Sequence, residues 1–212
     1  SHINETWGEV ERHIAHHRRP SIQWLADQGA LSPTFLAAHA VHMTDHDLAV
    51  ASEYGVGVSH CPSSNLKLAS GFAKVKKMLD VGITVGIGTD GAASNNRLDM
   101  FQEMRTAALL AKAVAKDGAA VDAHTALQMA TLSGARALGL ADLIGSVVPG
   151  KQADLISVDL TGADQLPIYD VASHLVYVSA RTDVTNVWVA GERIVADRTC
   201  ETVSAHEVRE LS

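Results

Sequence analysis

Apolar residues recur along the first two thirds of the chain with spacings that alternate between helix and strand. Between Thr6 and His17 they lie three and four positions apart, which predicts an amphipathic helix. Short apolar runs at 35–41, 55–62 and 83–90 each lead into a segment with helical spacing. These helices are expected near 45–54, 72–80 and 98–116. Strands that alternate with helices predict a parallel sheet, and near-continuous apolar runs predict strands covered on both faces.

The pattern changes after a further helix that we expect at 123–138. From Ile144 a Gly and Pro turn leads into an alternating strand, and the segment 186–198 predicts a hairpin that turns at 190–192. A short helix is expected in the connection 161–181. The predicted domains are residues 1–143, an α/β unit, and residues 144–212, a small β-rich unit with the C-terminal segment.

Composition excludes several classes of protein. The chain has 212 residues, 47% of them hydrophobic, but no apolar run approaches the ~20 residues of a membrane-spanning helix. A net charge of −7 repels phosphate backbones, so nucleic acid is not an expected partner. Cys61 and Cys200 lie too far apart in sequence for a CxxC zinc motif, and two cysteines make no disulfide framework. We expect neither membrane nor nucleic acid as partners, and a cytoplasmic location by default.

Polar residues stand where the predicted strands end. In parallel α/β folds, and in (β/α)₈ barrels above all, this edge carries the chemistry. His2 with Glu5, His39, His60 and Asp90 occupy such positions. A barrel would bring these side chains to one axis, where they could share a single metal ion.

Each of these residues also has an ordinary structural interpretation. Asp90, in the segment TVGIGTDGAASNN, is placed for a ligand at a strand end, but an Asp can equally cap the following helix. His2 and Glu5 can supply an imidazole and a proton carrier, or can be a solvated His and a first-turn Glu. His39 can orient a metal hydroxide or be a buried histidine with its hydrogen bonds satisfied. His60 we expect to have a packing or supporting role.

Other catalytic signatures are missing from the sequence. HEVRE near the C-terminus is not HExxH, and the HxE with PCxxC of cytidine-type deaminases is absent. The sequence contains neither the GxSxG elbow of serine hydrolases nor a Walker-type phosphate loop. The strand-end His and Asp residues therefore remain the best candidates for catalysis.

Four segments together resemble the amidohydrolase superfamily. They are HINE at 2–5, AAHAVH at 37–42, SHCPSSNLKLASG at 59–71 and GIGTDGAASNNRLDMFQEMRTAALLAK at 86–112. Within that superfamily they look most like the 5′-methylthioadenosine/S-adenosylhomocysteine deaminases and the related TRZ/ATZ chlorohydrolase-like enzymes. The segments at 130–140 and 144–159 resemble the family's return from its barrel to a β-sandwich. The resemblance implies the C-terminal half of a (β/α)₈ TIM-type barrel, with a small β-sandwich contribution from the tail.

The resemblance also implies roles for individual residues. His2 and Asp90 match metal ligands, Glu5 matches the glutamate that carries protons, and His39 matches the histidine beside the attacking hydroxide. Glu5, His39 and Asp90 would also contact substrate. The implied cofactor is one divalent ion, zinc by preference and iron as the alternative. The family's HxH ligand pair is missing, so we expect the N-terminal half of the same polypeptide to supply it.

The implied reaction is hydrolytic deamination of an adenosine-type substrate such as 5′-methylthioadenosine, S-adenosylhomocysteine or adenosine. The products would be ammonia and an inosine-type compound, and the substrate a small purine nucleoside. A homo-oligomer is expected from the same resemblance. One alternative is hydrolysis of guanine or of a chlorinated s-triazine. A different class of function is a non-catalytic half-barrel that serves as a binding fragment.

Overall fold

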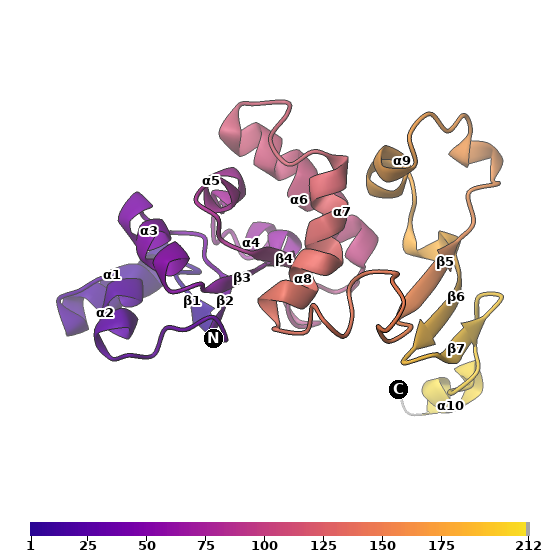
Figure 1. The fold of residues 1–212 in the computed structure, drawn as a ribbon, viewed down its shortest axis with the longest axis horizontal. Helices are drawn as coiled ribbons and strands as arrows, with labels where there is room; N and C mark the ends of the chain where they lie inside the picture. The colour runs from indigo at the N-terminus through magenta and orange to yellow at the C-terminus, as the bar shows by residue number, and fades with distance from the viewer. Residues whose placement is uncertain (211–212) are drawn as a thin grey trace.

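Four short parallel strands and their connecting helices form the larger part of the molecule. The computed structural model describes residues 1–210. Strands β1 (His2–Ile3), β2 (Leu36–His39), β3 (Gly57–His60) and β4 (Val85–Ile87) pair in that order. The helices are α1 (Trp7–His17), α2 (Ser21–Asp27), α3 (Asp45–Glu53), α4 (Pro62–Lys67), α5 (Val75–Asp80), α6 (Met100–Ala115), α7 (Ala123–Ala130) and α8 (Leu132–Ala137). The predicted α/β class is confirmed, and Figure 1 shows α1 to α3 beside β1 and β2.

Polar side chains cap the helices where the sequence changes from loop to helix. Thr44 accepts a hydrogen bond from the backbone N–H of Asp47, whose carboxylate accepts one from the backbone N–H of Thr44. This reciprocal pair satisfies two backbone donors and starts α3. Asp99 starts α6 in a similar way, because its carboxylate accepts hydrogen bonds from the backbone N–H groups of Phe101 and Gln102.

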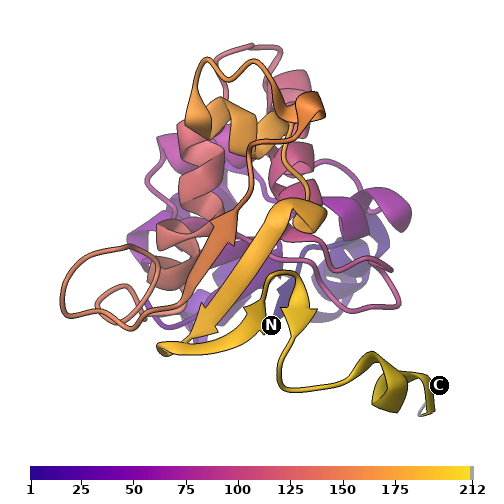
Figure 2. The same ribbon diagram turned by 90° about the vertical axis from the view of Figure 1, so that its right-hand side faces the viewer.

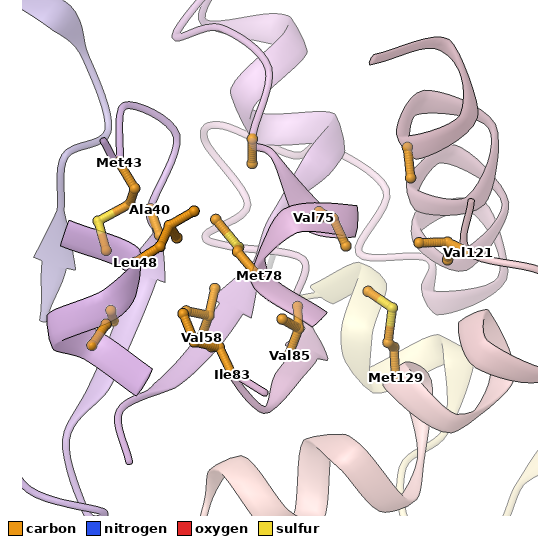
Figure 3. Packing of buried hydrophobic residues seen from close by; sticks show 14 of the residues in the cluster. Ala40, Met43, Leu48, Val58, Val75, Met78, Ile83, Val85, Val121 and Met129 are labelled. Carbon is orange, nitrogen blue, oxygen red and sulfur yellow. The ribbon is translucent and has the colours of Figure 1, made fainter. Parts of the chain in front are cut away.

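The hydrophobic core lies between the parallel sheet and the helices that follow its strands. Val58 on β3 and Val85 on β4 are fully buried and belong to the same cluster as Leu48, Met78 and Met129 (Figure 3). Leu48, Met78 and Met129 come from α3, α5 and α7. The apolar side chains of β3 and β4 are thus buried in one cluster with side chains from three different helices.

A second helix layer approaches the sheet through glycine. A Cβ atom on Gly86 of β4 would lie 2.8 Å from the Cα atom of Gly134 in α8. A Cβ atom on Gly57 of β3 would lie 3.1 Å from the carbonyl oxygen of Ala137. Neither position has room for a side chain, so these glycines allow the α8 backbone to pack directly on β3 and β4.

The single helix expected at 123–138 is wrong, because two helices occupy this segment. The chain breaks at Thr131, where φ is −129° and ψ is −97°. The Thr131 hydroxyl donates to the carbonyl oxygen of Leu127 at 2.7 Å, which offers the backbone a partner outside the regular helix pattern. Breaking the helix there redirects α8 onto the strands. Helices α2 and α4 were not predicted either, because each is shorter than two full turns, too short for a repeating apolar pattern.

The C-terminal part forms a separate antiparallel sheet. Strands β5 (Leu155–Val158), β6 (Val184–Val189), β7 (Glu192–Ala196) and β8 (Thr199–Cys200) pair in that order (Figure 2). The predicted hairpin is confirmed, and positive φ angles at Ala190 and Gly191 suit its two-residue turn. The remaining helical segments are η1 (Ala163–Gln165), α9 (Val171–Tyr177), η2 (Arg181–Asp183) and α10 (Ala205–Glu210).

Helix α9 joins the two parts of the molecule, since it packs against α6 and α7. The short helix expected within 161–181 is thereby confirmed. Within residues 1–210, no helix combines the length and the apolar content that crossing a membrane requires.

Candidate active site

Residues at or just beyond the ends of three parallel strands have an unusual backbone conformation. Asn4 after β1, His39 at the end of β2 and Asp90 after β4 have φ angles of 51°, 70° and 61°. Residues other than glycine rarely adopt this left-handed conformation, and such strain concentrates at functional sites. The three positions share the carboxyl edge of one parallel sheet, where the sequence predicted the chemistry.

His2, Glu5 and His39 come together at this edge. One potential ligand atom from each lies within 4.8 Å of the other two. The His39 Nε2 atom is 3.8 Å from Glu5 Oε2, and the rings of His2 and His39 meet edge to face with their centroids 4.9 Å apart. Imidazole nitrogens and a carboxylate oxygen are donors that zinc accepts in catalytic sites, and iron accepts them as well. These residues therefore fit a divalent ion, although they make an incomplete set of ligands.

Asp90 lies outside this group of three and is held by its own hydrogen bonds. Ser64 Oγ and Ser94 Oγ each donate to Asp90 Oδ2 at 2.6 Å. Partial burial raises the pKa of Asp90, but these bonds, the Gly91 backbone N–H and the charge of His39 outweigh it and lower the pKa to about 2. Asp90 is consequently ionised at neutral pH, as a metal ligand has to be. Its position is three residues beyond the end of β4.

His39 is buried, with 1% of its surface exposed, and one of its ring nitrogens is engaged. The Nδ1 atom lies 2.8 Å from Oδ1 of Asn65, which comes from α4. With Nδ1 engaged by the Asn65 amide oxygen, the Nε2 atom is the ring nitrogen that faces Glu5. Asn65 therefore fixes the direction of the His39 ring.

Glu5 receives support from residues on two sides. Ser70 Oγ donates to Glu5 Oε1 at 3.2 Å. The backbone N–H groups of Asn4 and Glu5 both donate to the Glu9 carboxylate at the start of α1. These bonds hold the turn between β1 and α1, so the Glu5 side chain stays near His39. The Glu5 side chain remains partly exposed, so a proton acceptor can reach it.

Two nearby histidines, His60 and His42, have different surroundings. His60 at the end of β3 is fully buried, and burial, with a smaller effect from His39, lowers its pKa to about 4. Its ring is therefore neutral at physiological pH. His42 Nε2 lies 2.6 Å from the Ser70 carbonyl oxygen, and its ring meets Trp7 with centroids 5.7 Å apart. Neither histidine belongs to the group formed by His2, Glu5 and His39.

Three supporting residues of the site, Ser64, Asn65 and Ser70, were not predicted from the sequence. All three come from the segment after His60. The available signal was a run of polar residues, SSN, directly after a buried strand and Cys-Pro. Such residues are common in loops, so only their contacts with Asp90 and His39 distinguish them.

Sequence comparison finds relatives that match nearly the whole of this chain. The amidohydrolase family profile matches residues 1–194. The chain is 50% identical over 207 residues to the 5-methylthioadenosine/S-adenosylhomocysteine deaminase of Moorella thermoacetica, which covers 98% of this chain and 48% of the relative. The chain thus spans about half the length of the curated relatives it matches.

Two solved structures have the same fold over nearly the whole chain. An adenosine deaminase from Xanthomonas campestris with bound zinc has a TM-score of 0.97 and 44% identity, covering 99% of this chain and 48% of that one. An atrazine chlorohydrolase from Arthrobacter aurescens TC1 complexed with zinc has a TM-score of 0.93 and 26% identity, covering 99% and 46%. The extent of the profile match and the identity to these relatives show that this chain belongs to the amidohydrolase family.

Proposed function

We propose that the protein containing this chain is a metal-dependent hydrolytic deaminase of adenosine-type nucleosides. The observation that carries the proposal is the convergence of His2, Glu5 and His39 at one sheet edge. Two relatives that are 48% and 50% identical to this chain are named 5-methylthioadenosine/S-adenosylhomocysteine deaminases, and these names support the choice of substrate. The zinc in the Xanthomonas adenosine deaminase supports the choice of metal.

The chain would act as the C-terminal half of a (β/α)₈ barrel. Four parallel strands cannot close into a barrel, and both β1 and β4 have a free edge among the described residues. We propose that an N-terminal half of the same polypeptide pairs with these edges and supplies the HxH ligands. Residues 1–143 would form half of the barrel, and residues 144–212 would contribute to a composite β-sandwich.

His2 and Asp90 would hold the ion together with ligands from the other half. A divalent ion in such a site supplies a nucleophile at neutral pH and stabilises negative charge on the substrate. Glu5 would accept the proton released at this step and transfer it to the purine ring nitrogen. His39, held through Asn65, would orient the attacking group toward the carbon that carries the amine. Asp90, ionised at neutral pH, would accept a proton and deliver it to the departing ammonia.

The test is a deamination assay on the complete polypeptide, loaded with one equivalent of zinc. The substrates would be adenosine, 5′-methylthioadenosine and S-adenosylhomocysteine, with ammonia release as the measurement. Activity on at least one of them is expected. Measurable zinc without ammonia release from any of them would overturn the proposal.

A second candidate is hydrolysis of an s-triazine or of guanine. The atrazine chlorohydrolase from Arthrobacter favours it, because its fold matches this chain closely. Its identity of 26% is well below the 50% of the deaminase relative, so we rank it second. Atrazine and guanine in the same assay separate the two, and a protein that binds no zinc would instead support a non-catalytic half-barrel.

A further inference from the structure

Glu103 is a buried acidic residue that lies behind the candidate site. Its side chain comes from α6, and only 1% of the residue is exposed. No ion pair joins it to a lysine, arginine or histidine within residues 1–210. A buried carboxylate without a cation is costly, so its two oxygens need strong hydrogen-bond donors.

Each Glu103 oxygen accepts a hydrogen bond from a different segment of the chain. Oε2 accepts from the backbone N–H of Ser63 at 3.0 Å, at the start of α4. Oε1 accepts from Asn95 Nδ2 at 2.7 Å, in the segment that follows Asp90. One carboxylate thus joins the start of α4 to the loop after β4.

The first turn of α4, which contains Ser63, leads directly to the site. Ser64 and Asn65, the next two residues, are both fully buried. Ser64 Oγ donates to Asp90 Oδ2 at 2.6 Å, while Asn65 Oδ1 lies 2.8 Å from His39 Nδ1. A shift of the Ser63 backbone would therefore move the hydrogen-bond partners of both Asp90 and His39.

The second loop is held through Asn95. Its Nδ2 atom donates both to Glu103 and to the carbonyl oxygen of Thr89, the latter at 2.9 Å. Thr89 directly precedes Asp90, whose φ angle of 61° needs a neighbouring constraint to persist. Asn95 supplies that constraint, and Glu103 orients Asn95.

We infer that Glu103 is a positioning residue that sets the metal affinity of the site through Ser63 and Asn95, without touching substrate or metal. The inference rests on the proposed function insofar as Asp90 is a metal ligand. Hydrogen bonds behind metal ligands commonly change metal affinity or activity by roughly 10- to 100-fold. Glu103→Gln turns one acceptor oxygen into a donor, so it cannot accept from both loops.

The experiment measures zinc affinity by competition with a chelator, in the complete polypeptide carrying Glu103→Gln. Zinc affinity should fall by roughly 10- to 100-fold. Asn95→Ala removes the hydrogen bonds to Thr89 and Glu103 but keeps the bond from Ser63 to Glu103, and it should lower the zinc affinity too. Glu53→Gln, at an exposed glutamate in α3, should leave it unchanged. A Co²⁺-loaded sample should also show an altered absorption spectrum for Glu103→Gln.

A loss of stability alone would not produce this result. Met78→Ala opens a cavity in the core and should lower the melting temperature while leaving zinc affinity intact. If Glu103→Gln lowers the melting temperature but binds zinc as tightly as the wild type, the inference is overturned. Since affinity is measured without substrate, a wild type that binds zinc but deaminates nothing would refute the proposed function and leave this inference standing.

Discussion

Ser64 donates a hydrogen bond to the Asp90 carboxylate, 26 residues farther along the chain. Ser64 belongs to α4, a helix of six residues, and Asp90 follows β4. The bond stabilises the ionised carboxylate. Asp90 and His39 are therefore both held by residues of the short helix α4.

Replacing Ser64 should change the acid titration of Asp90. Ser64→Ala removes one bond to the ionised form, so the Asp90 pKa should rise from about 2 toward the ordinary value of ~3.9. A ¹³C NMR titration of the side-chain carboxyl groups measures this directly. An unchanged Asp90 pKa in Ser64→Ala would contradict the role of the bond.

The same bond affects stability at acid pH. The folded pKa of Asp90 lies below its unfolded value, so ionised Asp90 stabilises the fold fully above pH ~4. That stabilisation is lost as the pH falls through about 2. As the pH falls over this range, the free energy of unfolding should decrease less for Ser64→Ala than for the wild type. Urea unfolding at several pH values measures this difference. Ser32→Ala, whose hydroxyl bonds Thr34 instead, should follow the wild-type curve.

Glu5→Gln should separate proton transfer from metal binding. The amide keeps the size of the side chain but cannot accept and release a proton, so turnover should fall by about 10²- to 10⁴-fold. Zinc content should stay near that of the wild type, because the proposed ligands remain. Ammonia release and zinc analysis on the same sample test this, with Glu53→Gln as the control. Near-normal turnover would show that Glu5 is not the proton carrier.

Asn65→Ala should disturb His39 without removing it. The Nδ1 atom of His39 would be left buried without its partner, at a cost of about 1–3 kcal/mol in unfolding free energy. The freed ring should lower kcat by about 10- to 100-fold. Asn186→Ala also loses hydrogen bonds, to Ser157 and Thr185 in the second sheet, but should keep its turnover. Equal kcat values in the two variants would contradict the orienting role.

Gly86→Ala should test the close packing of α8 on the sheet. The added Cβ would meet the Gly134 backbone at 2.8 Å, so α8 or β4 has to move, at a cost of about 1–3 kcal/mol. Gly118→Ala is the matched control, because nothing lies within 4 Å of its added Cβ. Urea midpoints measure both variants. If the two variants were equally stable, the packing of Gly134 on Gly86 would not constrain the fold.

The elements with a regular apolar period were predictable from the sequence. The helix after Glu5, the runs that became β2, β3 and β4, and the hairpin at 190–192 all follow from local spacing and turn residues. The break at Thr131 was not predictable, since the segment 123–138 keeps a helical period across it. At this break the Thr131 hydroxyl bonds to Leu127 and α8 turns to pack on Gly86, contacts that depend on the tertiary structure.

By itself the sequence determined the α/β class, the strand ends as the place for chemistry, and His2, Glu5, His39 and Asp90 as candidates. The tertiary structure decided which of these meet, bringing His2, Glu5 and His39 together and holding Asp90 separately through Ser64 and Ser94. It also brought Asn65 onto His39 and placed Glu103 between Ser63 and Asn95. The reason is physical: spacing along the chain reports which face of a strand or helix is buried. A hydrogen bond between loops depends instead on where separate strands end in the sheet.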